Sequence, residues 1–220
     1  MNEFLREPWE HPDWYDLHDN TWTAGPDREP EHYREFLLCL PPLDTGDHLF
    51  DLGAGTGKLA AMIAKGYPSL GAVTLIEPNP LKLERAKKRV SSLLPEATIQ
   101  ALPYRLGEPG QLPENEATLA TIGSVLMPYL EVYPGSLLTG LAWMQRFLTQ
   151  AHEMLRPGAW LYDLETLAAP WTSGDLSGAS RRLNMPELIE QFQQAGFESL
   201  ECVFRFRDRV VLRAHKPISS

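Results

Sequence analysis

Short apolar runs alternate with segments of helical periodicity over most of this chain. Five apolar runs are predicted to be strands, at 48–51, 72–76, 98–101, 117–125 and 159–164. The segments between them carry apolar residues three and four positions apart, the spacing of one helix face. Strands that alternate with helices predict a parallel sheet with helices on both faces.

The C-terminal part departs from this alternation. A helix marked by Met185, Leu188 and Phe192 and ended by Gly196 precedes two strands, 197–206 and 209–215. The short turn between these two strands forces them to be antiparallel. The other helices are predicted at 29–40, 57–65, 80–94 and 137–155. The fold class is therefore α/β, with a doubly wound, mostly parallel seven-stranded sheet and a C-terminal antiparallel hairpin.

The first 45 residues differ from the rest. They are rich in aromatic residues, including Trp14, Tyr15 and Trp22, and their periodicity is poor before the first helix. Aromatic residues at this density suggest a segment that packs onto the domain. We expect an N-terminal aromatic arm and helix at 1–45, which would cap the substrate, and a core at 46–220.

Charge and cysteine content narrow the possible partners. Lys and Arg number 20 against 29 Asp and Glu, a formal net charge of −9, which argues against nucleic acid as the main partner. Two groups of cations are predicted to be solvated faces: Lys82, Arg85, Lys87, Lys88 and Arg89 in one helix, and Arg205, Arg207, Arg209, Arg213 and Lys216 near the C-terminus. Cys39 and Cys202 fit no metal-binding spacing and are predicted to be buried thiols.

The cellular location is predicted from the absence of signal-peptide and membrane-span features. The first ten residues have no basic start followed by an apolar stretch, and no apolar run approaches the length of a membrane span. We therefore expect a cytoplasmic protein with no membrane partner, as a monomer or homodimer.

The segment Asp51-Leu-Gly-Ala-Gly-Thr-Gly-Lys-Leu-Ala60 carries the candidate chemistry. Its three glycines at alternate positions allow a sharp turn between strand and helix and let a ligand lie on the main chain. A phosphate-binding loop needs G-x-x-x-x-G-K followed by Ser or Thr, which is absent. The dinucleotide pattern G-x-G-x-x-G fails only at Lys58 and stays open. The pattern acid-x-G-x-G-x-G, with a second acid at Glu77 after the next strand, matches throughout.

These features resemble the class I S-adenosylmethionine-dependent methyltransferases over about residues 40 to 216. Leu75-Ile-Glu77-Pro78 resembles their second acidic motif, and Leu155-Arg-Pro-Gly158 resembles their turn into the fifth strand. The resemblance implies S-adenosylmethionine as cofactor and S-adenosylhomocysteine as product. It implies cofactor contacts at Asp51, Gly53, Ala54, Gly55, Gly57, Glu77, Pro78, Leu102 and Gly123.

The resemblance also assigns roles to the two acids. Glu77 would accept both ribose hydroxyls, and Asp51 would contact the methionine ammonium group, directly or through water. The alternatives are a helix-capping acid for Asp51 and a surface residue at a strand end for Glu77. The chain lacks the acid that family members often carry after the third strand, so the adenine contact falls to Leu102, Glu108 or backbone groups.

The acceptor site is expected beyond the carboxyl ends of the strands. Candidate general bases are His18, Tyr129 and Glu165, with a packing or surface role as the alternative for each. Substrate or lid residues are predicted at Trp14, Tyr15, Trp22, Met127, Tyr133 and Trp171. No metal is expected, because the His and Asp residues at 11–19 show no metal-ligand spacing.

The predicted function is methyl transfer to an O or N atom of a small aromatic or apolar molecule. The alternatives are a peptide or protein methyltransferase, a NAD-type oxidoreductase, and a degenerate cofactor-binding module.

Overall fold

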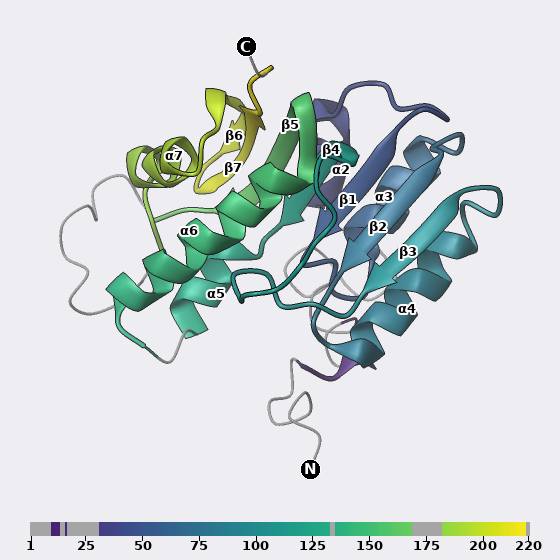
Figure 1. Cartoon of the computed structure of the whole chain (residues 1–220), viewed down its shortest axis with the longest axis horizontal. Helices are drawn as coiled ribbons and strands as arrows, with labels where there is room; N and C mark the ends of the chain where they lie inside the picture. Colours follow the sequence, from purple (N-terminus) through teal and green to yellow (C-terminus); the bar gives the residue numbers. More distant parts are fainter. Residues whose placement is uncertain (1–9, 14–15, 17–30, 133–134, 169–181, 219–220) are drawn as a thin grey trace. The chain divides into compact units, whose positions relative to one another are not determined.

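A computed structural model describes residues 10–13, 16, 31–132, 135–168 and 182–218. The chain divides into two compact units, 1–105 and 106–220. Within the described residues, seven strands form a mixed sheet, with neighbours β3-β2-β1 in the first unit and β4-β5-β7-β6 in the second (Figure 1). The predicted fold class is confirmed. The predicted division at residue 45 stays a prediction.

The first unit is built around three parallel strands, β1 (His48–Leu52), β2 (Ala72–Ile76) and β3 (Thr98–Leu102). β1 pairs with β2 so that Asp51 lies opposite Leu75, and β2 pairs with β3 so that Ile76 lies opposite Leu102. The ends of β1 and β2 that carry the candidate motif therefore lie side by side, at the carboxyl ends of the parallel strands.

The same unit contains the helices α2 (Glu31–Cys39), α3 (Lys58–Gly66) and α4 (Pro80–Ser91). α4 begins where Asn79 accepts hydrogen bonds from the N–H groups of Leu81 and Lys82, with Pro80 in the first turn. Its apolar side, with Leu83, Ala86 and Val90 buried, packs on β2, β3 and α3.

The second unit holds β4 (Ala117–Gly123), α5 (Leu126–Val132), α6 (Leu137–Met154), β5 (Leu155–Thr166), α7 (Met185–Gln194), β6 (Glu198–Phe206) and β7 (Arg209–His215). β4 and β5 are parallel, whereas β7 is antiparallel to both β5 and β6. α6 contacts α5, α7 and β5, and its buried side includes Trp143 and Phe147 (Figure 1).

Two local expectations are wrong. The strand predicted at 117–125 ends at Gly123, and Leu126–Val132, for which no helix was predicted, forms α5. The turn expected at Arg156 to Gly158 lies inside β5, where the pairing with β4 shifts register between Ala117 and Leu119. Gly158 accommodates this irregularity with a φ of 81°.

The predictions for the cysteines and for the C-terminal cations are also partly wrong. Cys202 is exposed and Cys39 is only half-buried. Lys216 is buried, and its ammonium group donates to the Asn115 side chain at 3.0 Å and to the Leu155 carbonyl at 2.7 Å. Arg213 is half-buried, because its guanidinium group pairs with Glu201 and lies 4.7 Å from the centre of the Trp160 ring.

Candidate functional site

The glycine turn between β1 and α3 rests on the end of β2. The N–H groups of Gly53 and Ala54 both donate to the Ile76 carbonyl at 2.9 Å. Gly53, Gly55 and Gly57 all have positive φ, at 78°, 53° and 76°. Left-handed conformations of this kind favour glycine, so the alternate glycines are explained by the backbone path itself.

Glu77 closes the turn from the side of β2. Its Oε2 accepts a hydrogen bond from the Gly55 N–H at 3.0 Å, and its Oε1 accepts one from the Asn79 N–H at 2.9 Å. The side chain is buried, and burial raises the pKa of Glu77 although these two donors and Lys82 lower it. Glu77 is therefore not a surface residue at a strand end, because its carboxylate connects the turn to the start of α4.

The other predicted cofactor residues of the first unit lie on the same two strand ends. Asp51 is 2% exposed on β1, and Ala54 is buried in the turn. Pro78 is half-buried directly after Glu77. Leu102 is half-buried at the end of β3, and its carbonyl accepts the Glu77 N–H at 3.2 Å. Gly123 belongs to the second unit, where it ends β4.

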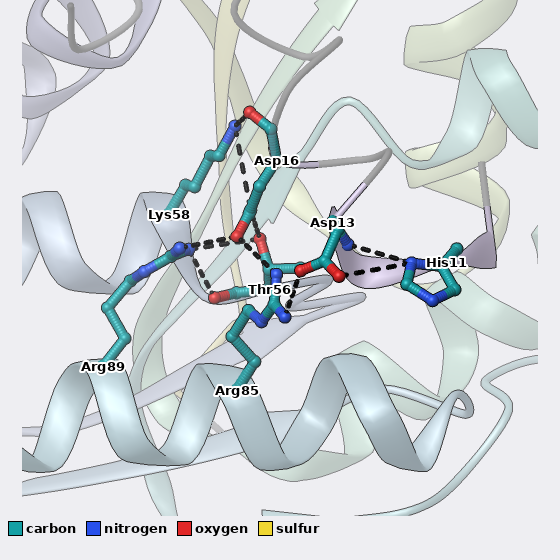
Figure 2. A network of polar contacts seen from close by, with 7 residues as sticks. All are labelled: His11, Asp13, Asp16, Thr56, Lys58, Arg85 and Arg89. Atoms are coloured by element: carbon teal, nitrogen blue, oxygen red, sulfur yellow. Dashed lines mark hydrogen bonds and ion pairs between the residues drawn. The ribbon is translucent and has the colours of Figure 1, made fainter. Parts of the chain in front are cut away.

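A polar network that was not predicted from the sequence joins part of the N-terminal arm to the glycine turn. Figure 2 shows the Asp16 carboxylate between Thr56 of the turn and the guanidinium groups of Arg85 and Arg89 on α4. Lys58, the first residue of α3, donates to the Asp16 carbonyl at 3.0 Å. The expectation of a solvated cationic face on α4 is therefore wrong for Arg85 and Arg89. It is wrong for Lys82 as well, which is buried.

In the second unit, Glu165 lies at the start of α5. Its completely buried carboxylate accepts hydrogen bonds from the N–H groups of Val125 at 2.8 Å, Leu126 at 2.6 Å and Met127 at 3.4 Å. It satisfies donors that the beginning of a helix leaves open. Burial raises the pKa of Glu165 to about 7, although these donors and the charge of Arg182 lower it. This arrangement gives Glu165 a structural task, and its catalytic role stays a prediction.

Asp163 lies two positions earlier on the same face of β5. Its side chain is completely buried, and within the described part of the chain neither carboxylate oxygen has a hydrogen-bond partner. Burial raises the pKa of Asp163 well above its ordinary value, and the charge of Glu165 raises it further. Each acid opposes the ionisation of the other, so we expect Asp163 to hold a proton at neutral pH.

This buried acid gives a pH-dependent prediction. A raised native pKa means that the native chain binds more protons than the unfolded chain once the pH exceeds about 4, so the contribution of Asp163 to stability falls as pH rises. Asparagine does not titrate, so the variant Asp163→Asn lacks this loss of stability at higher pH. The free energy of unfolding of the variant, relative to the original chain, should therefore increase between pH 5 and pH 8, with a limiting slope of about 1.4 kcal/mol per pH unit.

Urea unfolding at pH 5, 6.5 and 8 measures this difference. Glu198→Gln, on the exposed start of β6, serves as control and should show no such trend. A difference between Asp163→Asn and the original chain that stays constant over this range would contradict the prediction.

Two predicted residues of the acceptor region lie in α5. Met127 is completely buried, and its sulfur accepts the Leu183 N–H at 3.3 Å. Tyr129 is half-buried and stacks on Trp143, with ring centroids 3.7 Å apart. The predicted residues Trp14, Tyr15, His18, Trp22, Tyr133 and Trp171 lie outside the described residues.

A cavity of about 230 Å³ lies in the second unit, between the start of α7 and the turn that joins β6 to β7. Its lining combines the apolar residues Leu167, Met185 and Val210 with the polar residues Arg205, Arg207 and Asp208. Among the residues that the structure describes, no group of three or more His, Cys, Asp or Glu is placed to hold a metal ion. No helix in that part of the chain is long and apolar enough to cross a membrane.

No protein-family model matches the chain, and no curated protein matches its sequence. Solved structures do share its fold. Human N-acetylserotonin methyltransferase, solved with S-adenosylmethionine, aligns with a TM-score of 0.69 at 18% identity over 97% of this chain and 58% of its own. The mitomycin 7-O-methyltransferase MmcR aligns at 0.65 and 18% identity over 96% of this chain and 60% of its own. This chain thus spans less than two thirds of either protein.

The cyclase SpnF has the same fold over nearly its whole length. It aligns with a TM-score of 0.64 at 18% identity, covering 96% of this chain and 97% of its own. The chain therefore adopts the fold of solved S-adenosylmethionine-dependent methyltransferases. Because that fold also occurs in the cyclase SpnF, the fold alone does not determine the reaction, which depends on the residues of the site.

Proposed function

We propose that this chain binds S-adenosylmethionine and transfers its methyl group to an O or N atom of a small, largely apolar acceptor. The observation that carries the proposal is the joint placement of Glu77 and the glycine turn. Each carboxylate oxygen of Glu77 receives one backbone N–H, from Gly55 or from Asn79, and keeps capacity for a further donor. Two neighbouring ribose hydroxyls supply two such donors.

The charge of the site favours this cofactor over a dinucleotide. Asp51 and Glu77 place two buried acids at the ends of β1 and β2. Carboxylates attract a ligand that carries a sulfonium and an ammonium group, whereas they repel a pyrophosphate. Lys58, the one cation within the motif, is paired with Asp16. These features support S-adenosylmethionine and count against NAD.

The bound cofactor would supply a methyl carbon already activated by its sulfonium sulfur. The acceptor would take up this methyl carbon through a lone pair, in exchange for the carbon–sulfur bond, and the cofactor would be released as a neutral thioether. The chain's own task is to hold the two partners in line and to exclude water. A proton on the acceptor atom passes to solvent or to a base, for which Tyr129, Glu165 and His18 stay predicted candidates.

A small acceptor is supported by the cavity of the second unit. Its volume of about 230 Å³ suits a compact molecule rather than an extended peptide, and Leu167, Met185 and Val210 make part of its lining apolar. Leu167 and Ala168, which help to line it, lie in the segment after β5 where the acceptor is expected. We further propose that the acceptor is contacted by Met127 and by the aromatic residues at 14, 15, 22, 133 and 171. In this proposal the arm at 1–45 caps the bound acceptor.

Calorimetry and a turnover assay test the proposal together. Titration with S-adenosylhomocysteine, S-adenosylmethionine and NAD should show binding of the first two and none of the third. Release of S-adenosylhomocysteine is then measured with a panel of small phenols and amines and with a mixture of unstructured peptides. Binding of NAD alone would overturn the cofactor assignment. Turnover of peptides but not of small molecules would replace the acceptor class.

A further inference from the structure

Asp16 is the most heavily contacted acid in the described part of the N-terminal arm. Its Oδ1 accepts a hydrogen bond from the Thr56 hydroxyl at 2.5 Å. Its Oδ2 accepts one from Arg89 at 2.9 Å and one from Arg85 at 3.2 Å. These three donors lie 40 to 73 positions away in the sequence and come from the glycine turn and α4 (Figure 2). Asp16 therefore connects three separate segments of the first unit.

The environment of Asp16 makes this contact more than an exposed ion pair. Its side chain is 21% exposed, against 72% for Asp13, which contacts Arg85 alone among the α4 and turn residues drawn in Figure 2. Burial raises the pKa of Asp16, but hydrogen bonds from Thr56 and Arg89 and the charge of Arg89 outweigh it, so the net pKa lies below its ordinary value. Asp16 is thus held as a carboxylate.

The same network reaches the backbone of the glycine turn. Arg89 donates to the Thr56 carbonyl at 2.6 Å and to the Thr56 hydroxyl at 3.1 Å. Thr56 lies between Gly55, whose N–H donates to Glu77, and Gly57, the N-cap residue of α3. The carboxylate of Asp16 orients Arg89 while Arg89 holds the Thr56 carbonyl, so loss of Asp16 would weaken the hold of Arg89 on the turn.

A second contact attaches the arm to Asn79, two residues after Glu77. The Asn79 side chain donates to the Glu10 carbonyl at 2.7 Å, while the Asn79 N–H donates to Glu77. Residues 10 and 16 of the arm are therefore attached to both segments that hold the Glu77 carboxylate.

We infer that Asp16 is a positioning residue for the cofactor site: it fastens the arm to Thr56 and Arg89 and thereby couples arm docking to cofactor binding. The inference rests on the proposed function. Coupling of this kind is reciprocal, so an arm that stabilises the bound form of the turn is itself held more firmly when cofactor is present. Asp16 touches neither cofactor nor acceptor in this role.

Calorimetry with S-adenosylhomocysteine on the full chain tests the inference. Asp16→Asn should weaken binding about tenfold, within the usual range of coupling between sites. Asp13→Asn is the matched control, since it makes the same change in the same arm at an exposed position, and it should alter affinity less than twofold. Asp16→Glu, which keeps the charge, should recover part of the loss.

A double-mutant cycle separates positioning from general loss of structure. Arg89→Met should also weaken binding, and the effects of Asp16→Asn and Arg89→Met should be clearly less than additive. Unfolding in urea monitors the stability of each variant. An Asp16→Asn variant with unchanged affinity, or equal losses in Asp16→Asn and Asp13→Asn, would overturn the inference alone. An original chain that does not bind S-adenosylhomocysteine would overturn the proposed function, and the inference with it.

Discussion

Replacing Gly57 by alanine is expected to lower the free energy of unfolding by about 2–5 kcal/mol, the sum of a left-handed backbone penalty and overpacking. Gly57 has a φ of 76°. A Cβ at this position would lie 2.7 Å from the Cα and 2.8 Å from the Cβ of Ala86 on α4. The Ala86 Cα is backbone, so relief requires the turn or α4 to move.

Urea unfolding of Gly57→Ala measures this loss, and Gly46→Ala is the control. A Cβ at Gly46 would meet only the Asp44 side chain, at 3.2 Å, and its backbone is not left-handed. The double variant Gly57→Ala with Ala86→Gly should recover only part of the loss, because the clash with the backbone of residue 86 remains. A Gly57→Ala variant as stable as Gly46→Ala would contradict the close packing of the turn against α4.

Replacing Glu77 by glutamine is expected to weaken S-adenosylhomocysteine binding by about 30-fold to 100-fold, the equivalent of one hydrogen bond to a charged group. The amide keeps one acceptor oxygen and turns the other into a donor. In the variant this new donor would face the N–H group of Gly55 or of Asn79. In the original chain both of these groups donate to the carboxylate. The variant therefore loses ligand contacts and disturbs the turn.

Calorimetry measures the affinity, with Glu84→Gln on the exposed side of α4 as the matched control. Because burial raises the pKa of Glu77, affinity in the original chain should also fall as pH is lowered through the native pKa, and Glu77→Gln should lack this dependence. A folded Glu77→Gln variant that binds within twofold of the original chain would remove the main support for the proposed function.

The sheet was largely predictable because its signals are local. The apolar run 72–76 coincides with β2, and the turn at Arg207 and Asp208 separates β6 from β7 as expected. The helix over residues 126–132 was not predictable in the same way. Its apolar residues form a nearly continuous run with Pro128 inside it, and its start is stabilised by Glu165, which lies about 40 positions away.

The site was predictable as far as its chemistry lies within the motif. Gly55 and Glu77 share a hydrogen bond, as the joint pattern of glycines and acid suggested. Arg85 and Arg89 were misjudged because their partner, Asp16, lies in a segment without periodicity. Spacing along α4 shows that the two arginines share a face, but it carries no information about which distant acid meets them.

The irregular pairing of β6 bears on association between copies of the chain. β6 pairs only with β7 in the sheet order of the second unit, and its register shifts twice, between Glu198 and Glu201 and between Cys202 and Phe204. Its exposed positions include Glu201 and Arg205. Bulges and charges on an outer strand interrupt the regular row of backbone groups that another strand needs for pairing. Extension of the sheet across this strand, and aggregation by that route, is therefore disfavoured.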